Sequence, residues 1–245
     1  MVALDAGRML MEAGASAKRT EQIVMKFATG LGAERVELRI GYASLAITIG
    51  IGATGITRMR KVGALGVNQR LDLALWALAE QVAQRKLSLI ETRTELTRLA
   101  TGHQRHPAWL VALAVGLACA AFGRLLKADW LATGPVFLAA GIGQLIRREL
   151  ILRRVNHFFC ATVVAFLGAL LGGLGARWLG SETVMTAMLA SILLLVPGVP
   201  AVNAQTDILE GYPTLGSARA VTVVMALVFI AAGLWLAQVL LNPAH

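Results

Sequence analysis

The spacing of apolar residues changes along this 245-residue chain and divides it into regions. From Leu4 to Leu31 apolar residues recur with the period of a helix, interrupted at Gly14. Apolar and polar residues then alternate in three short segments, 36–40, 44–50 and 55–62, which is typical of strands. Helical spacing returns between Leu71 and Leu99. From residue 107 onward the apolar segments are long and free of charge, as in membrane helices.

The first region, residues 1–106, is predicted to form a small α+β domain. Two helices, three strands and two further helices would pack with the helices on one face of an antiparallel sheet. Ser16 stands where the second helix needs an N-cap, and Asn68 stands just before the third. We interpret Asn68 as a cap in preference to a ligand.

The second region, residues 107–245, is predicted to be an all-α bundle of five transmembrane helices. Seventeen residues of helix rise about 26 Å, slightly less than the hydrocarbon core of roughly 30 Å, so the shorter segments still suffice. The chain is therefore predicted to be a mixed membrane protein. The five expected spans cover residues 107–123, 130–146, 158–176, 183–199 and 221–241.

Basic residues predict how the spans are oriented. The connection between the second and third spans carries four arginines, Arg147, Arg148, Arg153 and Arg154, and outweighs the other connections. By the positive-inside rule this connection is cytoplasmic. The α+β domain is then cytoplasmic and the C-terminus lies outside. We interpret these arginines as topology anchors.

Composition agrees with a membrane protein and excludes several other classes. The chain is 57% hydrophobic and 15% charged, with a mean hydropathy of +0.67. Its net charge of +9 does not indicate nucleic-acid binding, because the basic residues of the second region flank apolar spans. Cys119 and Cys160 lie in separate apolar segments, so no disulfide is expected. No metal-ligand spacing or phosphate-binding loop appears, and neither a metal nor a cofactor is predicted.

Small residues predict close helix contacts in the membrane region. A stripe including Ala112 and Gly116 runs along the first span, and Gly168 with Gly172 forms a GxxxG motif on the third. A unit of five spans has no room for two equal inverted repeats. We therefore expect a second subunit or self-association.

The third strand carries a basic cluster. Alternation places Arg58 and Arg60 on one face and Thr57 and Lys61 on the other, so either face could meet an anion. We favour the interpretation as a solvated strand face, since charged residues are common on exposed or edge strands, with anion binding as the alternative.

The most unusual stretch is residues 193–211. Pro197, Gly198 and Pro200 are expected to break an apolar helix, and broken backbone in a membrane is tolerated only where it is buried in protein or lines a cavity. If the helix resumes after Pro200, Asn203 and Asp207 share a face, with Gln205 and Glu210 off it. This pair either holds a polar substrate or a proton, or marks a helix end where Asp207 is merely solvated.

Three segments together resemble the bacterial threonine/serine exporter family: GITRMRKVGALGVN (55–68), HPAWLVALAVGLACAAFGRL (106–125) and LLLVPGVPAVNAQTDILEG (193–211). The resemblance covers essentially the whole chain and is strongest to the shorter branch, whose five-span members work beside a separate small membrane subunit. It implies a bacterial inner membrane protein that exports threonine and serine or, in the split branch, succinate. It also implies functional importance for the motif residues Thr57, Arg58, Pro197, Gly198, Pro200, Asn203 and Asp207.

The leading hypothesis is a component of an exporter for a small polar metabolite, driven by the proton motive force, with Asp207 as a candidate proton site. Its expected partners are that metabolite, membrane lipid, and a second small subunit or further copies of the chain. One alternative is a membrane-anchored hydrolase, although no catalytic constellation stands out in residues 1–106. Another is a regulatory or scaffolding subunit that senses anions through Arg58, Arg60 and Lys61.

Overall fold

The structure is a computed structural model that describes residues 1–50, 55–102 and 106–241. The chain forms two compact units. The first comprises Met1–Gln104 together with Gly198–Val221, and the second comprises Arg105–Pro197 together with Thr222–His245.

The first unit is built on a three-stranded antiparallel sheet in the order β1-β2-β3. Its strands are β1 (Val36–Ile40), β2 (Ser44–Ile49) and β3 (Ile56–Lys61), so the three predicted strands are confirmed. Leu45 of β2 stands opposite Ile40 of β1 and Arg60 of β3. Side chains on alternate positions therefore point to the same face, and Leu45 and Ile47 are buried there.

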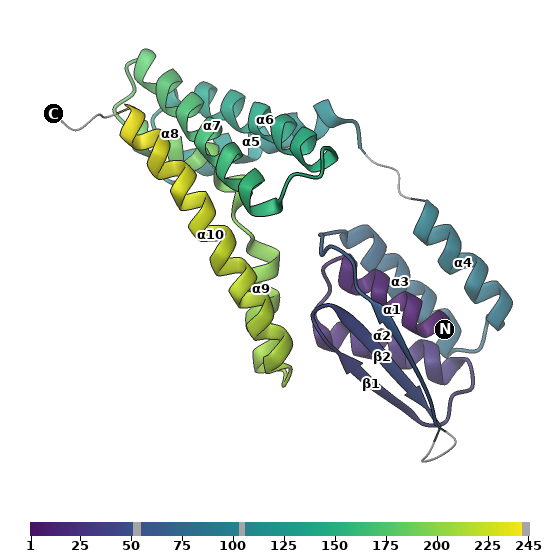
Figure 1. Cartoon of the computed structure of the whole chain (residues 1–245). Coiled ribbons are helices and arrows are strands. Elements are labelled where there is room, and N and C mark those ends of the chain that lie inside the picture. The colour runs from purple at the N-terminus through teal and green to yellow at the C-terminus, as the bar shows by residue number, and fades with distance from the viewer. Residues whose placement is uncertain (51–54, 103–105, 242–245) are drawn as a thin grey trace. The chain divides into compact units, whose positions relative to one another are not determined.

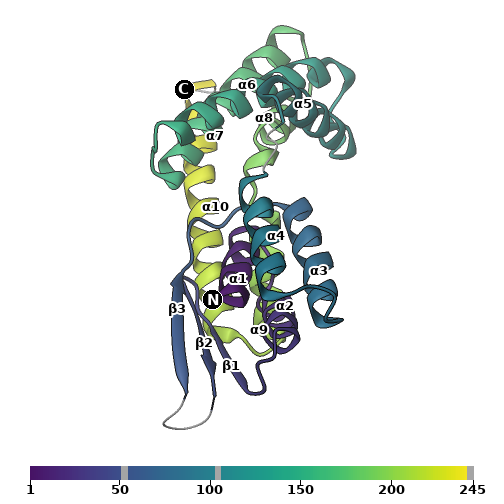
Figure 2. The same ribbon diagram turned by 90° about the vertical axis from the view of Figure 1, so that its right-hand side faces the viewer.

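Helices cover this buried face of the sheet (Figures 1 and 2). Helices α1 (Val2–Glu12) and α2 (Ala17–Gly30) contact the strands directly, and their side chains Leu4, Leu10 and Phe27 are fully buried in the same core. Helices α3 (Gln69–Ala83) and α4 (Leu89–Thr101) pack against α1 and α2. The predicted α+β arrangement, with its helices on one face, is confirmed for these residues.

Local capping explains where these helices begin. The Ser16 side chain accepts a hydrogen bond from the backbone N–H of Arg19 at 3.3 Å, and Asn68 accepts one from Leu71 at 3.0 Å. Ser88 and Glu91 form a capping box at the start of α4. The predicted caps at Ser16 and Asn68 are therefore confirmed.

Two later segments also belong to the first unit. These are α9 (Gly198–Leu209) and the beginning of α10 (Pro213–Leu241). Leu215, which is only 2% exposed, joins the core formed by α1, α2 and the sheet. We call α9 together with residues 213–221 the α9–α10 hairpin. The pattern of apolar residues gave no indication that these residues complete the N-terminal domain.

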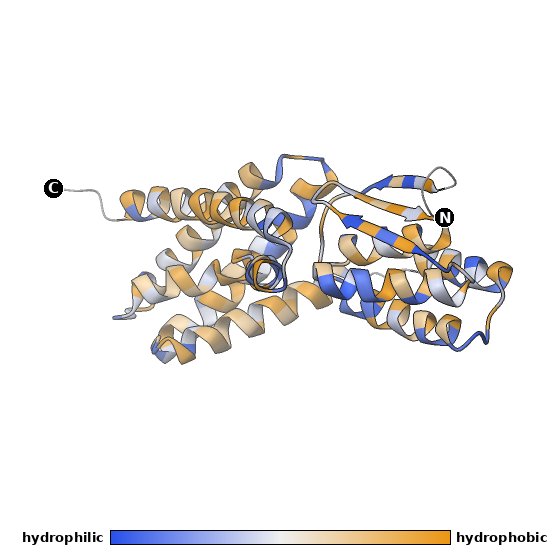
Figure 3. Cartoon of the chain, turned by 90° about the horizontal axis from the view of Figure 1, so that it is seen from below, coloured by the Kyte–Doolittle hydropathy of each residue, from blue (hydrophilic) through white to orange (hydrophobic). Residues whose placement is uncertain are grey.

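The second unit contains α5 (Ala108–Leu125), α6 (Trp130–Leu152), α7 (His157–Trp178), α8 (Val184–Ser191), the 3-10 helix η2 (Leu193–Leu195) and the rest of α10. Apolar residues cover most of the surface of these helices, whereas apolar and polar residues alternate over the strands and N-terminal helices (Figure 3). Such helices suit a lipid environment, because apolar side chains face outward as well as inward.

Small residues allow the close helix contacts that the sequence predicts. A Cβ added at Gly116 of α5 would lie 2.7 Å from the backbone oxygen of Phe137 on α6. A Cβ at Gly172 of α7 would collide with the side chain of Ser191 on α8. Cys119 and Cys160 are buried free thiols.

Among the described residues, three helices are long and apolar enough to cross a membrane: α5, α7 and α10. A fourth span is counted if α8, η2 and α9 form one interrupted crossing. The chain is thus a multi-pass membrane protein, but the predicted bundle of five helices is not confirmed. The uncounted helix is α6, which is 23 residues long but contains polar and helix-disfavouring residues such as Pro135 and Gln144.

At one end of the second unit, hydrogen bonds join the connection before α6 to the connection before α8, and the end of α7 to the end of α10. The Asp129 side chain, before α6, accepts bonds from Ser181 and from the backbone of Glu182, before α8. Arg177, near the end of α7, donates to the carbonyl of Leu241 at the end of α10. The arginine-rich connection differs from its prediction in one respect: α6 continues to Leu152, because neither proline nor glycine occurs between Gln144 and Leu152.

Candidate functional site

The α9–α10 hairpin carries the polar pair singled out by the sequence. Its turn is sharp because Gly211 adopts a positive φ of 92°, after which Pro213 begins α10. A Cβ at Gly216 would lie 2.7 Å from the carbonyl oxygen of Ala204, so the two helices approach closely because that residue is glycine.

Asn203 and Asp207 face the turn between α1 and α2, which comprises residues 13–17 and is called the α1–α2 turn below. Asn203 Nδ2 donates to the carbonyl of Gly14 at 2.6 Å. The backbone N–H of Ala17 donates to Asp207 Oδ1 at 2.8 Å. Ala17 is the first residue of α2, so the carboxylate also lies at the positive end of that helix. The shared face expected from the four-residue spacing is present, and Gln205 is exposed away from it.

Arg219 of α10 completes this arrangement. Its Nη1 donates to Asp207 Oδ2 at 2.6 Å, and its Nη2 donates to the carbonyl of Ala15 at 2.9 Å. The side chains of Arg219 and Asp207 are 3% and 0% exposed, which makes this a fully buried ion pair. The guanidinium thus bridges the carboxylate and the α1–α2 turn.

Sequence reasoning missed Arg219, which lies just before the predicted fifth span. A signal was available, because a single arginine beside an apolar segment is costly to bury unless it has a partner. Glu210 and Asp207 are the two charged residues nearest to Arg219 in the sequence, so they were the candidate partners.

This site is a buried network of polar groups that bond to one another. Both carboxylate oxygens of Asp207 accept hydrogen bonds from protein donors, and two guanidinium nitrogens of Arg219 are engaged. Breaking one partner of such a buried pair leaves an uncompensated charge. The arrangement therefore fixes the α9–α10 hairpin to the rest of the N-terminal domain.

Further contacts surround the buried pair. Lys18 forms an ion pair with Glu210 at 3.4 Å, and the Tyr212 hydroxyl donates to the carboxylate of Glu21. Burial raises the pKa of Tyr212, and the hydrogen bond and charge of Glu21 raise it further. The hydroxyl therefore remains a donor at physiological pH.

The α1–α2 turn is also held from the segment between β3 and α3. The backbone N–H groups of Gly66 and Asn68 donate to the carbonyls of Glu12 and Ala13, at 2.9 and 2.8 Å. Gly14 adopts a positive φ of 90°, which a residue with a side chain rarely does. Asn68 thus meets the same turn as Asn203 and Asp207, but through its backbone, while its side chain caps α3.

The proline motif breaks the helix as predicted, and the next helix begins before Pro200. Helix η2 ends at Leu195, Pro197 lies in the break, and α9 begins at Gly198. Pro200 is the third residue of α9, where its missing N–H removes no hydrogen bond within the helix. Because α9 already includes Pro200, Asn203 and Asp207 both lie within one continuous helix.

The basic cluster on β3 is separate from this site in the described part of the chain. Thr57, Arg58 and Lys61 are exposed, and the Thr57 hydroxyl lies 2.9 Å from that of Thr48. Arg60 is instead directed toward α1, where its Nε donates to Asp5 Oδ1 at 2.8 Å. Within residues 1–50, 55–102 and 106–241, no group of three or more potential metal ligands is found.

Long apolar helices in one chain with an α+β domain define a multi-pass membrane protein. The family model described as "Putative threonine/serine exporter" matches residues 1–241, and the chain belongs to this family. It is accordingly a component of a transporter and not an enzyme.

Two curated relatives carry the same description, "Probable succinate transporter subunit YjjP". The protein from Klebsiella aerogenes is 29% identical over 211 residues, which cover 86% of this chain and 81% of the relative. The protein from Escherichia coli K12 is 28% identical over 217 residues, which cover 88% and 84%. No solved structure matches the chain.

Proposed function

We propose that this chain is one subunit of a two-subunit exporter that moves a small polar metabolite out of the cytoplasm. A dicarboxylate such as succinate is the preferred substrate class, with threonine and serine as the alternative. The proposal is supported by the family membership and by the description of both relatives as succinate transporter subunits. A second, small membrane subunit is the expected partner.

We further propose that the chain lies in the bacterial inner membrane with its N-terminal domain in the cytoplasm and its C-terminus outside. The basic residues near the end of α6 favour this orientation. The contacts of Asp129 with Ser181 and of Arg177 with Leu241 place the connection before α6, the connection before α8 and the end of α10 at the same end of the second unit. This arrangement supports helices that cross the membrane in alternating directions.

The observation that carries the proposed mechanism is the buried pair of Asp207 and Arg219 against the α1–α2 turn. In this proposal the pair couples the cytoplasmic domain to α10, which continues into an apolar segment long enough to cross the membrane. Protonation of Asp207 would remove the charge that holds Arg219 and release the α9–α10 hairpin. Coupling to the proton motive force would act through this step.

The motif residues have distinct places in this proposal. Asn203 and Asp207 form the polar contacts of the hairpin, while Pro197, Gly198 and Pro200 set the break at which α9 begins. Eight residues of α8 and three of η2 rise only about 18 Å, well short of a roughly 30 Å core. If α8 starts at the outer surface of the membrane, the break between η2 and α9 would therefore lie within the membrane.

The test is efflux of labelled succinate, threonine and serine from loaded cells that express the chain with and without its partner subunit. Asp207→Asn should reduce efflux strongly at an unchanged level of membrane insertion. Gln205→Asn, on the exposed side of α9, serves as the matched control and should transport normally. Normal efflux by a well-inserted Asp207→Asn protein would refute the coupling role, and export of none of the three metabolites would refute the substrate proposal.

A further inference from the structure

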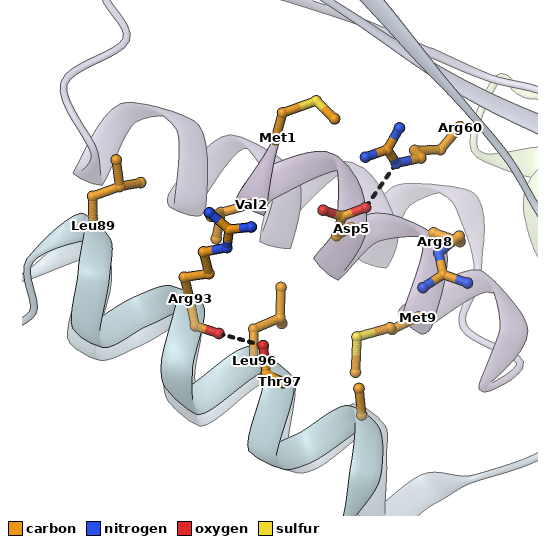
Figure 4. A pocket seen from close by; sticks show the side chains of 11 residues that line it. Met1, Val2, Asp5, Arg8, Met9, Arg60, Leu89, Arg93, Leu96 and Thr97 are labelled. Atoms are coloured by element: carbon orange, nitrogen blue, oxygen red, sulfur yellow. Dashed lines mark hydrogen bonds and ion pairs between the residues drawn. The ribbon is translucent and has the colours of Figure 1, made fainter.

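The N-terminal domain contains an open pocket of about 640 Å³ that lies apart from the α9–α10 hairpin. It is formed by α1, β3 and α4 (Figure 4). Asp5 and Arg8 reach it from α1, Arg60 from β3, and Arg93 with Thr97 from α4. Side chains from three separate elements therefore converge on one space.

Positive charge dominates the polar lining of this pocket. Three arginines stand against one carboxylate, Asp5, which pairs with Arg60 at 2.8 Å. Arg8 pairs with Glu12 at 3.3 Å through one nitrogen, which leaves its other donors available. Arg93 has no carboxylate partner among the residues that the structure describes. Arg93 and Thr97 are four residues apart and so share one face of α4.

Apolar side chains form the remainder of the lining. Val2 and Met9 come from α1, and Leu96 comes from α4 (Figure 4). No aromatic ring is present among the described lining residues, so the pocket offers no surface on which a nucleotide base would stack. A short hydrocarbon body with negative groups at its ends fits these features.

We propose that this pocket binds a small organic dicarboxylate in the cytoplasmic domain. Arginine pairs with carboxylates through parallel hydrogen bonds, which gives the site its selectivity for this group. One carboxylate would bind Arg93 on α4, and the other would bind Arg8 and the nitrogens of Arg60 that do not contact Asp5. The Thr97 hydroxyl donates to the backbone carbonyl of Arg93 at 2.9 Å and so lines the pocket without donating to the ligand. The bound dianion would tie α4 to α1 and β3. The pocket is lined by none of the residues of the α9–α10 hairpin, and the inference does not depend on which metabolite is exported.

Succinate binding to the full-length protein in nanodiscs, measured by titration calorimetry, tests this site. Arg93→Gln should weaken binding about tenfold or more, the typical effect of losing one charge-assisted contact. Arg98→Gln is the matched control, because Arg98 lies on the same helix, pairs with Glu95 and does not line this pocket. Inorganic phosphate and acetate serve as comparison ligands and should bind at least several-fold more weakly than succinate.

Equal succinate affinity in the Arg93→Gln and Arg98→Gln proteins would overturn the proposal. Phosphate binding as tight as succinate binding would also overturn the assignment to dicarboxylates. Efflux measured in parallel separates this inference from the proposed function. Loss of succinate binding in Arg93→Gln would support the pocket even if no succinate is exported, and normal export with unchanged binding would refute the pocket alone.

Discussion

Removing the charge of Asp207 should loosen the N-terminal domain far more than removing a neighbouring surface charge. The Asp207→Asn side chain keeps its shape and an oxygen for the Ala17 N–H, but it leaves Arg219, only 3% exposed, without a counter-ion. Breaking a buried pair in this way costs about 3–5 kcal/mol. Since each 1.4 kcal/mol is a factor of about ten, the α9–α10 hairpin should open roughly one hundred to three thousand times more often.

Hydrogen exchange of the full-length protein measures this opening directly. The Ala17 amide is the reporter, because it is buried and bonded to Asp207. The control is Lys18→Met, which removes the partner of Glu210 from a pair whose lysine is 52% exposed. Such pairs contribute about 0–1 kcal/mol, so exchange in this variant should rise less than about sixfold.

A double variant distinguishes the buried charge from a general loss of packing. Asp207→Asn combined with Arg219→Met leaves no buried charge, and most of the lost protection should return. The reasoning would be refuted if Asp207→Asn accelerated exchange no more than Lys18→Met. It would also be refuted if the double variant were less protected than Asp207→Asn alone.

Three further predictions concern stability, which is measured by thermal unfolding of the purified protein. Gly216→Ala should destabilise the first unit by about 1–3 kcal/mol, because its Cβ would lie 2.7 Å from a backbone oxygen of α9. Gly134→Ala should be neutral or stabilising, since nothing lies within 4 Å of the added Cβ; destabilisation by this variant would contradict the described packing. Ser88→Ala should cost about 1 kcal/mol by removing the capping box of α4, and an unchanged unfolding temperature would contradict that role.

Local features of the fold could be predicted because their causes lie within a few residues. The Ser16 and Asn68 caps depend on donors three residues away, and the alternation around Leu45 follows from strand geometry. The helix break near Pro197 has an equally local cause. In each case a side chain and the backbone it affects are neighbours in sequence.

The partners of Asp207 could not be predicted in the same way. Its hydrogen bond to Ala17 joins residues 190 positions apart, and periodicity carries no information about such a distance. Residues 198–221 also follow an apolar segment and precede another, so their pattern is equally compatible with a connection between spans. Only tertiary packing distinguishes a solvated carboxylate from a buried one.

The position of Leu215 in the N-terminal core has a consequence for the order in which the protein matures. The ribosome synthesises residues 1–104 first. The core that they form is completed by the side chain of Leu215 and by the pair of Asp207 and Arg219, which are synthesised about one hundred residues later. The first domain to emerge is therefore completed only after the helices α5, α6, α7 and α8 have been synthesised.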